Sequence, residues 1–250
     1  MKRIAVLSVL ASIGAFGQGG RGGGGAPVAA RAAAPVDLTG YWVSVVTEDW
    51  RYRMVTPVKG DYPSIPLNPE GRKTADAWDP AKDEAAGNQC KSYGAGNIMR
   101  QPGRVHITWD NDNVLKVETD AGTQTREFYF TGAQPPTGEP AWQGVSIAQW
   151  EFAGGPRGGR GKASSGSGSL KVVTTRMRPG YLQKNGVPYS ANAIVTENFH
   201  RTVEPNGDSW MIVTTLVEDP QYLTARFIRC THFKKQSDAS GWNPTPCEAR

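Results

Sequence analysis

The sequence predicts an all-β protein built as one antiparallel barrel of about eight to ten strands, with one short helix. Two observations lead to this prediction. From residue 104 onward, short segments rich in aromatic and β-branched residues follow one another at hairpin spacing. Turn-forming sequences separate them, such as residues 110–113 (DNDN) and Asn206-Gly207. Such a series is typical of a meandering sheet that closes on itself.

The first strand and the helix precede that series. Residues 40–47 (GYWVSVVT) are aromatic and β-branched and predict the first strand. A helix is expected to begin at Asn68, because Asn is a favoured N-cap and Pro69 suits the first turn. It is expected to run to about Trp78, with a second short turn up to Ala86.

The remaining strands belong to a single domain, residues 37–250. Between two of them lies the Gly/Ser/Arg-rich segment 153–169, which is expected to be a disordered hairpin loop because it holds too little apolar surface to pack. The strands are expected at residues 104–109, 114–119, 124–131, 146–152, 170–177, 191–203, 209–218 and 224–233.

The N-terminus predicts export. Residues 1–17 combine a basic start, a short apolar run and small residues around a cleavage site after Gly17, which is the pattern of a signal peptide. The apolar run is too short to span a bilayer, so no membrane span is expected after cleavage. Residues 18–36 are rich in Gly, Ala and Pro and predict a disordered leader. The mature protein is therefore expected to be secreted or periplasmic.

The basic net charge does not predict a nucleic-acid partner. The chain carries a formal net charge of +5, from 28 Lys and Arg against 23 Asp and Glu. Seven of the basic residues lie in segments 1–36 and 153–169, which hold no acidic residue, so 21 bases face 23 acids elsewhere. The Arg-Gly-Gly steps in these segments are similar to RNA-binding tracts, but in an exported protein we expect solvated linkers.

Three cysteines in an oxidising compartment predict one disulfide and one remaining thiol. Cys90 and Cys247 both lie in loop-type sequence, whereas Cys230 lies within a strand pattern. We therefore expect a Cys90–Cys247 bond that ties the C-terminal tail to the barrel.

Two resemblances support this fold. Gly40-Tyr41-Trp42 resembles the Gly-x-Trp signature of lipocalins, in which the Trp closes one end of the barrel. Nearly the whole mature chain resembles a family of uncharacterised secreted bacterial β-rich proteins, which implies the fold and export but brings no established activity. The matching pieces are residues 67–71 (LNPEG), 77–78 (AW), Cys90, 98–99 (IM), 101–105 (QPGRV), Arg126, 142–146 (WQGVS), 150–151 (WE), 170–175 (LKVVTT), 195–197 (VTE), Arg201 and 218–220 (EDP), and also Cys247.

Charged residues on apolar strand faces are the main candidates for a site. Glu197 and Arg201 share a face with Phe199, and Arg126 shares a face with Phe128. Because buried charges are costly unless they are paired, Arg126, Glu197 and Arg201 are expected to form one buried cluster. Two interpretations stay open: an anchor for a carboxylate-bearing or otherwise polar ligand, and a structural ion-pair network that plugs the barrel.

Other candidate residues carry weaker patterns. Trp142 and Trp150 bracket a segment that could line the entrance of a ligand site. Within it, Ser146 nearly matches a nucleophile elbow, but a strand follows where a helix is needed. The three histidines, one of them His200, do not lie at metal-ligand spacing, and no metal or cofactor is expected.

The function we expect is non-catalytic binding of a small apolar or amphipathic molecule inside the barrel. One alternative is a barrel enzyme, an isomerase or hydrolase with Glu197 or His200 as general acid/base. A second alternative is a structural cell-envelope protein with a packed barrel. The interior of the barrel distinguishes these possibilities, because a ligand or substrate needs an open cavity there.

Overall fold

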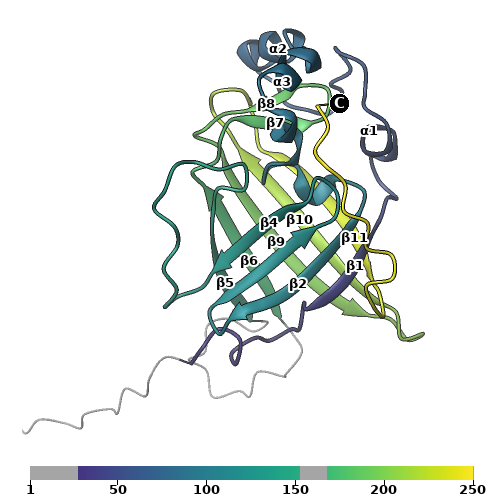
Figure 1. Cartoon of the computed structure of the whole chain (residues 1–250), viewed down its shortest axis with the longest axis vertical. Helices are drawn as coiled ribbons and strands as arrows, with labels where there is room; N and C mark the ends of the chain where they lie inside the picture. Colours follow the sequence, from purple (N-terminus) through teal and green to yellow (C-terminus); the bar gives the residue numbers. More distant parts are fainter. Residues whose placement is uncertain (1–27, 153–167, 250) are drawn as a thin grey trace, which may run out of the picture.

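The computed structural model describes residues 28–152 and 168–249, and in these ranges nine strands form one closed barrel (Figure 1). Their order around the barrel is β1-β11-β10-β9-β6-β5-β4-β3-β2. The predicted all-β barrel is therefore confirmed. The nine strands are β1 (Gly40–Val45), β2 (Arg104–Asn111), β3 (Val114–Thr119), β4 (Gln124–Tyr129), β5 (Val145–Phe152), β6 (Gly168–Thr175), β9 (Ile194–Val203), β10 (Ser209–Glu218) and β11 (Phe227–Lys235).

The barrel is not purely antiparallel, which corrects the prediction. β4 and β5 run parallel and pair at only two positions, Phe128 with Ser146 and Tyr129 with Ile147. The reason is the long connection at residues 130–144, which returns the chain along the barrel wall so that β5 starts beside the end of β4. Parallel neighbours need such a crossover, whereas a tight turn produces an antiparallel hairpin.

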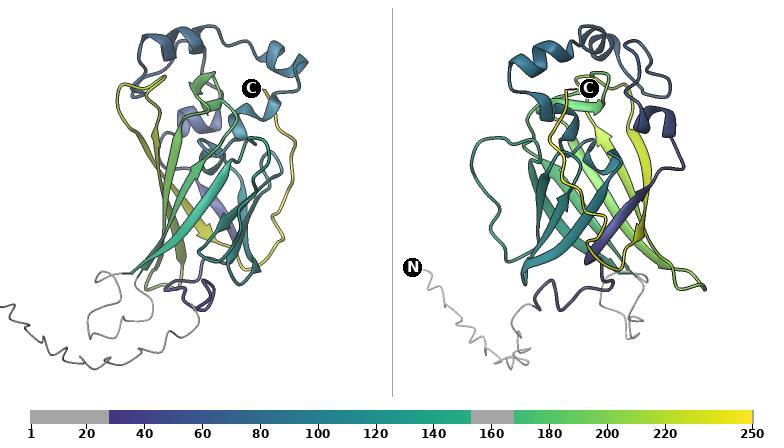
Figure 2. Two further views of the ribbon diagram at one scale, coloured as in Figure 1. Left: turned by 90° about the vertical axis from the view of Figure 1, so that its left-hand side faces the viewer. Right: turned by 45° about the vertical axis from the view of Figure 1, so that its right-hand side comes forward.

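Helices and a small hairpin cover one end of the barrel, where the sequence predicted one helix (Figure 2). Asn68 caps α2 as expected, because its side-chain oxygen accepts a hydrogen bond from Gly71 N at 2.8 Å. This cover, called the lid below, consists of α2 (Pro69–Asp76), α3 (Pro80–Ala85), the 3-10 helices η1 (Gln89–Tyr93) and η2 (Ile98–Arg100), and the pair β7 (Gly180–Gln183) and β8 (Val187–Tyr189). A further short helix, α1 (Trp50–Met54), lies beside the barrel below the lid.

The N-terminal segment from residue 28 packs onto the opposite end of the barrel. The backbone of Ala30 accepts a hydrogen bond from Trp150 Nε1 at 2.8 Å and donates one to Asn113 Oδ1 at 2.9 Å. The predicted disordered leader, residues 18–36, is therefore too long, because these backbone groups find fixed partners on the barrel. The predicted signal peptide and residues 18–27 lie outside the described residues, as does most of the segment 153–169, although β6 begins within it at Gly168.

Two apolar clusters fill the barrel. On β9 the inward side chains are Val195, Glu197 and Phe199, and all three have no solvent-accessible area. Val195 belongs to the cluster beneath the lid, and Phe199 belongs to the cluster in the body of the barrel. A water-sized void beside these side chains would leave them accessible area, so the interior around them is packed solid. Other members with no accessible area are Trp42, Val117, Phe128, Leu170, Val172, Met211, Val213, Leu182, Val187, Tyr189 and Val217.

The predicted disulfide is present. Cys90 in η1 bonds to Cys247 with an S–S distance of 2.04 Å, across a sequence separation of 157 residues. The C-terminal tail also donates a backbone hydrogen bond from Thr245 N to Asp120 O at 2.9 Å. The tail therefore fastens the lid to the side of the barrel. Cys230 is free and exposed on β11.

We predict that the variant Cys90→Ser/Cys247→Ser loses about 2–5 kcal/mol of unfolding free energy, because the bond closes a long loop in the unfolded chain. Urea denaturation followed by circular dichroism measures this change. Cys230→Ser is the matched control and is expected to stay within about 0.5 kcal/mol of the unmodified protein. Equal stability of the double variant and the control would contradict the prediction.

Candidate functional site

A buried ion pair crosses the centre of the barrel. Arg126 on β4 contacts Glu197 on β9 through two hydrogen bonds, Nη1 to Oε1 at 3.1 Å and Nη2 to Oε2 at 2.5 Å. Both side chains are fully buried. Arg126 Nη2 also donates to Thr174 Oγ1 at 3.3 Å, and the Ser146 and Thr174 hydroxyls are 2.8 Å apart. Bidentate pairing of this kind is the geometry that compensates the desolvation of both charges.

The polar layer around this pair is not fully satisfied. Arg126 Nε, the Tyr189 hydroxyl and Thr215 Oγ1 are buried and have no hydrogen-bond partner among the described residues. The Arg126 guanidinium lies 4.9 Å from the centroid of the Phe128 ring, which compensates part of its charge. Burial raises the pKa of Tyr189, and the nearby Arg126 opposes that rise. Since the pair leaves neither charge free, its geometry is that of a structural plug.

Arg201 does not join this cluster, which corrects the prediction. Its Nε donates to Ser209 Oγ at 2.7 Å, and its Nη1 donates to Asp37 O at 2.7 Å, near the barrel end that faces away from the lid. Glu197 and Arg201 do share a face of β9, but four residues along a strand separate them by about 13 Å. A shared face therefore does not imply a shared site.

The candidate catalytic residues lie apart. Glu197 points inward and is paired, whereas His200 is exposed on the outer face of the same strand. His200 borders an open surface hollow of about 300 Å³ together with Glu151 and Ser169. Ser146 is buried against Thr174, and β5 continues after it without a helix. Glu197, His200 and Ser146 therefore do not come together in one site.

The two candidate tryptophans also separate. Trp150 packs at the end of the barrel away from the lid, with its ring centroid 5.3 Å from Phe130 and 6.4 Å from Trp109. Trp142 instead lies beside the seam between β4 and β5, just before the residues at which their parallel pairing begins. Only Trp142 therefore borders the cleft described next, whereas Trp150 lines a separate hollow of about 370 Å³ together with Trp109 and the N-terminal segment.

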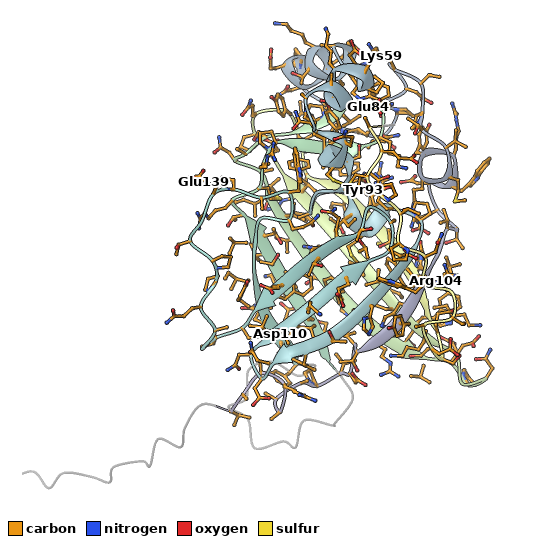
Figure 3. All side chains as sticks on the ribbon, in the orientation of Figure 1. Lys59, Glu84, Tyr93, Arg104, Asp110 and Glu139 are labelled. Atoms are coloured by element: carbon orange, nitrogen blue, oxygen red, sulfur yellow. A yellow bond between two sulfur atoms is a disulfide. The ribbon has the colours of Figure 1, made fainter. Side chains whose placement is uncertain are left out.

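The seam between β4 and β5 holds a cleft of about 380 Å³. It exists because β4 pairs with β5 only at Phe128 and Tyr129, which leaves the earlier part of β4 without a partner strand on that side. The connection 130–144 leaves the barrel surface here, and Glu139 stands on its outer side (Figure 3). The residues that line the cleft are Gln124, Thr125, Arg126, Glu127, Tyr129, Pro136, Ala141, Trp142, Gln143 and Gly144.

The side chain of Arg176 holds the backbone that forms the outer wall of the cleft. Arg176 donates hydrogen bonds to the carbonyl oxygens of Pro136 at 3.2 Å, Thr137 at 3.0 Å and Gly138 at 2.5 Å. These three hydrogen bonds from one guanidinium fix the position of residues 136–138 relative to the β4–β5 seam. The cleft is therefore a built feature of the fold.

Hydrogen-bond acceptors and aromatic rings dominate the cleft. The Gln143 amide nitrogen donates to Tyr93 O at 2.6 Å and to Gln124 Oε1 at 3.0 Å, while its Oε1 is buried and has no hydrogen-bond partner in the described part of the chain. The Glu127 carboxylate accepts a hydrogen bond from the Tyr129 hydroxyl and forms no ion pair with the described residues. Burial and the contact with Glu127 raise the pKa of Tyr129 to about 12.

One cation lies against the aromatic wall. The Arg178 guanidinium lies 4.0 Å from the centroid of a Trp142 ring and donates to Asn88 Oδ1 at 3.2 Å. This contact fixes the indole in place. A flat apolar body could pack against such a preorganised ring, while a donor or cationic group of the same molecule reached the Glu127 carboxylate.

Sequence reasoning found Arg126 and Trp142 but missed the cleft that both of them line. Gln124, Glu127, Tyr129 and Gln143 carry no spacing motif, and their proximity depends on the direction of β5. The one available signal was the length of the connection at residues 130–144, which is too long for a hairpin turn.

Comparisons with known proteins do not assign the chain to a family. No protein-family model matches it, and no curated protein sequence matches it. Within residues 28–152 and 168–249, no helix has the length and apolar character needed to cross a membrane. The same residues contain no group of three or more His, Cys, Asp or Glu side chains arranged to hold a metal ion.

We predict that Arg126→Ala and Glu197→Ala each lower the unfolding free energy by about 3–5 kcal/mol, because each leaves one buried charge without its partner. The double variant Arg126→Met/Glu197→Leu removes both charges at similar volume, and it is expected to be more stable than either single variant. Urea denaturation of the three variants provides the measurement. Single variants that lose less than about 1 kcal/mol would contradict a buried, mutually dependent pair.

Proposed function

We propose that this protein is an exported, non-catalytic binding domain that takes one small amphipathic molecule in the cleft at the β4–β5 seam. The observation that carries the proposal is the cleft itself, a space of about 380 Å³ beside Trp142 and the exposed carboxylate of Glu127. This volume lies within the range of about 300–1,000 Å³ that is usual for small-molecule sites.

The cleft replaces the barrel interior as the expected location of the ligand. Side chains such as Phe128, Phe199 and Val213 have no accessible area. A ligand between them would have to displace core side chains and separate Arg126 from Glu197, which is costly for both charges. The side cleft needs no such rearrangement, so it is the better site for the ligand.

The lining of the cleft indicates the chemistry of the ligand. Trp142, Tyr129 and Pro136 offer an apolar wall. The exposed carboxylate of Glu127 offers an acceptor that forms no ion pair with a described residue and accepts one hydrogen bond, from the Tyr129 hydroxyl. A molecule with a flat apolar body and an amine or hydroxyl head complements both walls.

Export is part of the proposal. The Cys90–Cys247 disulfide is stable in an oxidising compartment. The signal sequence at residues 1–17 and the resemblance to secreted bacterial β-rich proteins point in the same direction. We therefore expect the binding domain to act outside the cell or in the periplasm.

A second candidate function is favoured by the packed interior. A solid barrel with a central ion pair and a fastened tail suits a structural protein of the cell envelope. The enzyme alternative has less support, because Glu197 is fully buried and paired with Arg126. Ligand binding at the cleft distinguishes the binding domain from the structural protein.

Three probes that share one ring test the proposed binding site: 1-naphthylmethylamine, 1-naphthylmethanol and 1-naphthylacetate. We predict that isothermal titration calorimetry finds one binding site, with the amine about fivefold tighter than the alcohol, because Glu127 attracts the cation at a partly exposed site. The acetate is expected to bind most weakly. Trp142→Ala should weaken the amine and the alcohol about tenfold.

Trp210→Ala serves as the control, since Trp210 lies on the outer face of β10 and does not line the cleft. This variant is expected to bind all three probes as the unmodified protein does. Glu127→Gln should bring the amine and the alcohol to similar affinities. Absence of binding by all three probes, or undiminished binding by Trp142→Ala, would leave the structural protein as the better description.

A further inference from the structure

A cluster of exposed apolar side chains lies on and just after α1. Trp50 is 63 % exposed, Met54 59 %, Val55 64 % and Val58 73 %. The other exposed large hydrophobic side chains of the described chain are scattered over the N-terminal segment and separate strands, as with Ile147 and Val203. Four such side chains within nine residues make a patch of the kind that marks an interaction surface. These four residues are called the α1 patch below.

A buried arginine anchors α1, the helix that carries the start of the α1 patch, to the barrel. Arg53 is buried, and its Nε donates to Arg100 O at 2.9 Å. Its two terminal nitrogens donate to Glu48 Oε1 at 3.2 Å and Ser44 Oγ at 3.0 Å. Trp50 and Met54 are one turn apart and share a face of the helix. Arg53 thus fixes α1 against the barrel, while the α1 patch stays exposed to solvent.

Basic residues outnumber acidic ones around the α1 patch. Each of the three carboxylates in the segment is engaged by a base: Glu48 by Arg53 and His232, Asp49 by Arg100 and Arg229, and Asp61 by Arg51 at 2.8 Å. Lys59 is exposed on the same segment, beyond α1 toward the lid (Figure 3). The bases are Arg51, Arg53, Lys59, Arg100 and Arg229, which leaves a net positive charge beside the apolar side chains.

Arg100 keeps its charge at neutral pH despite its burial. Burial, together with the neighbouring Arg229 and Arg53, lowers its pKa to about 10, while Asp49 acts in the opposite direction. The positive charge behind α1 is therefore a stable property of the site between pH 5 and 8.

We propose that the α1 patch docks on an anionic lipid surface. Trp50 is the side chain best suited to the headgroup boundary, since its ring is amphipathic and Trp is enriched there. Met54, Val55 and Val58 can enter the upper acyl region, while Arg51 and Lys59 meet anionic headgroups. The apolar side chains of the α1 patch and the basic residues beside it thus fit one occupant, a bilayer that carries negative charge.

The described N-terminal segment, from residue 28 onward, does not cover the patch. Ala30 contacts Asn113 between β2 and β3, at the end of the barrel away from the lid and α1 (Figure 2). The docking proposal also does not depend on the cleft, because none of the cleft-lining residues belongs to the α1 patch. Ligand binding and lipid binding can therefore fail separately.

Co-sedimentation with vesicles tests the proposal, using phosphatidylcholine alone and an equal mixture of phosphatidylcholine and phosphatidylglycerol. The expected result is binding to the mixed vesicles that weakens with added salt and is much weaker on phosphatidylcholine. Trp50→Ser/Met54→Ser should lower the partition coefficient at least about tenfold. Arg51→Gln/Lys59→Gln should remove most of the preference for the mixed vesicles.

Two comparisons keep the outcome specific. Ile147→Ser/Val203→Ser removes similarly exposed side chains elsewhere on the barrel and should leave vesicle binding unchanged. Trp50→Phe should still bind, but it should lose the quenching of tryptophan fluorescence by brominated phosphatidylglycerol. A far-UV circular dichroism spectrum and a urea midpoint of the serine variant that match those of the unmodified protein show that its loss of binding does not arise from misfolding.

Three results would overturn the proposal. The first is no binding of the unmodified protein to mixed vesicles. The second is equal binding by Trp50→Ser/Met54→Ser. The third is self-association in sedimentation velocity that this variant abolishes while vesicle binding is absent, which would assign the α1 patch to a second copy of the chain.

Discussion

The Arg126–Glu197 pair at the centre of the barrel is the interaction on which the rest of the structure depends. Both side chains are fully buried, so each charge is tolerated only because the other lies against it. The pair spans the interior from β4 to β9 and separates the apolar cluster under the lid from the cluster in the body of the barrel. The hydroxyl groups of Ser146 on β5 and Thr174 on β6 lie beside the pair and complete a polar layer across the packed interior.

The same strand that supplies this pair also creates the outer cleft. Alternation along β4 directs Arg126 and Phe128 inward and Glu127 outward. The parallel pairing with β5 is short, and it leaves this part of β4 open beside Trp142 and Gln143. The fold therefore combines a packed interior with a local opening in its hydrogen-bonded wall, and Glu127 borders this opening.

Much of the fold could be predicted from local chemistry, because turns, caps and alternation act within a few residues. β3 and β10 have the predicted bounds, Asn68 caps its helix, and the Cys90–Cys247 bond forms. The direction of β5 could not be predicted, since it depends on the path of residues 130–144 across the barrel. Nor could α1, whose position depends on the contacts of Arg53 with distant segments. The ion pair could be predicted because charged residues occur on apolar strand faces. The cleft could not be predicted, because it depends on the topology of β4 and β5 and has no local sequence pattern.

A crystal structure of the protein with 1-naphthylmethylamine bound tests most directly whether binding occurs outside a solid barrel. The expected result is a naphthyl ring against Trp142 with its ammonium group near Glu127, while Arg126 and Glu197 keep their paired geometry. The contradicting result is a probe inside the barrel, between Phe128 and Phe199, with the Arg126–Glu197 pair separated.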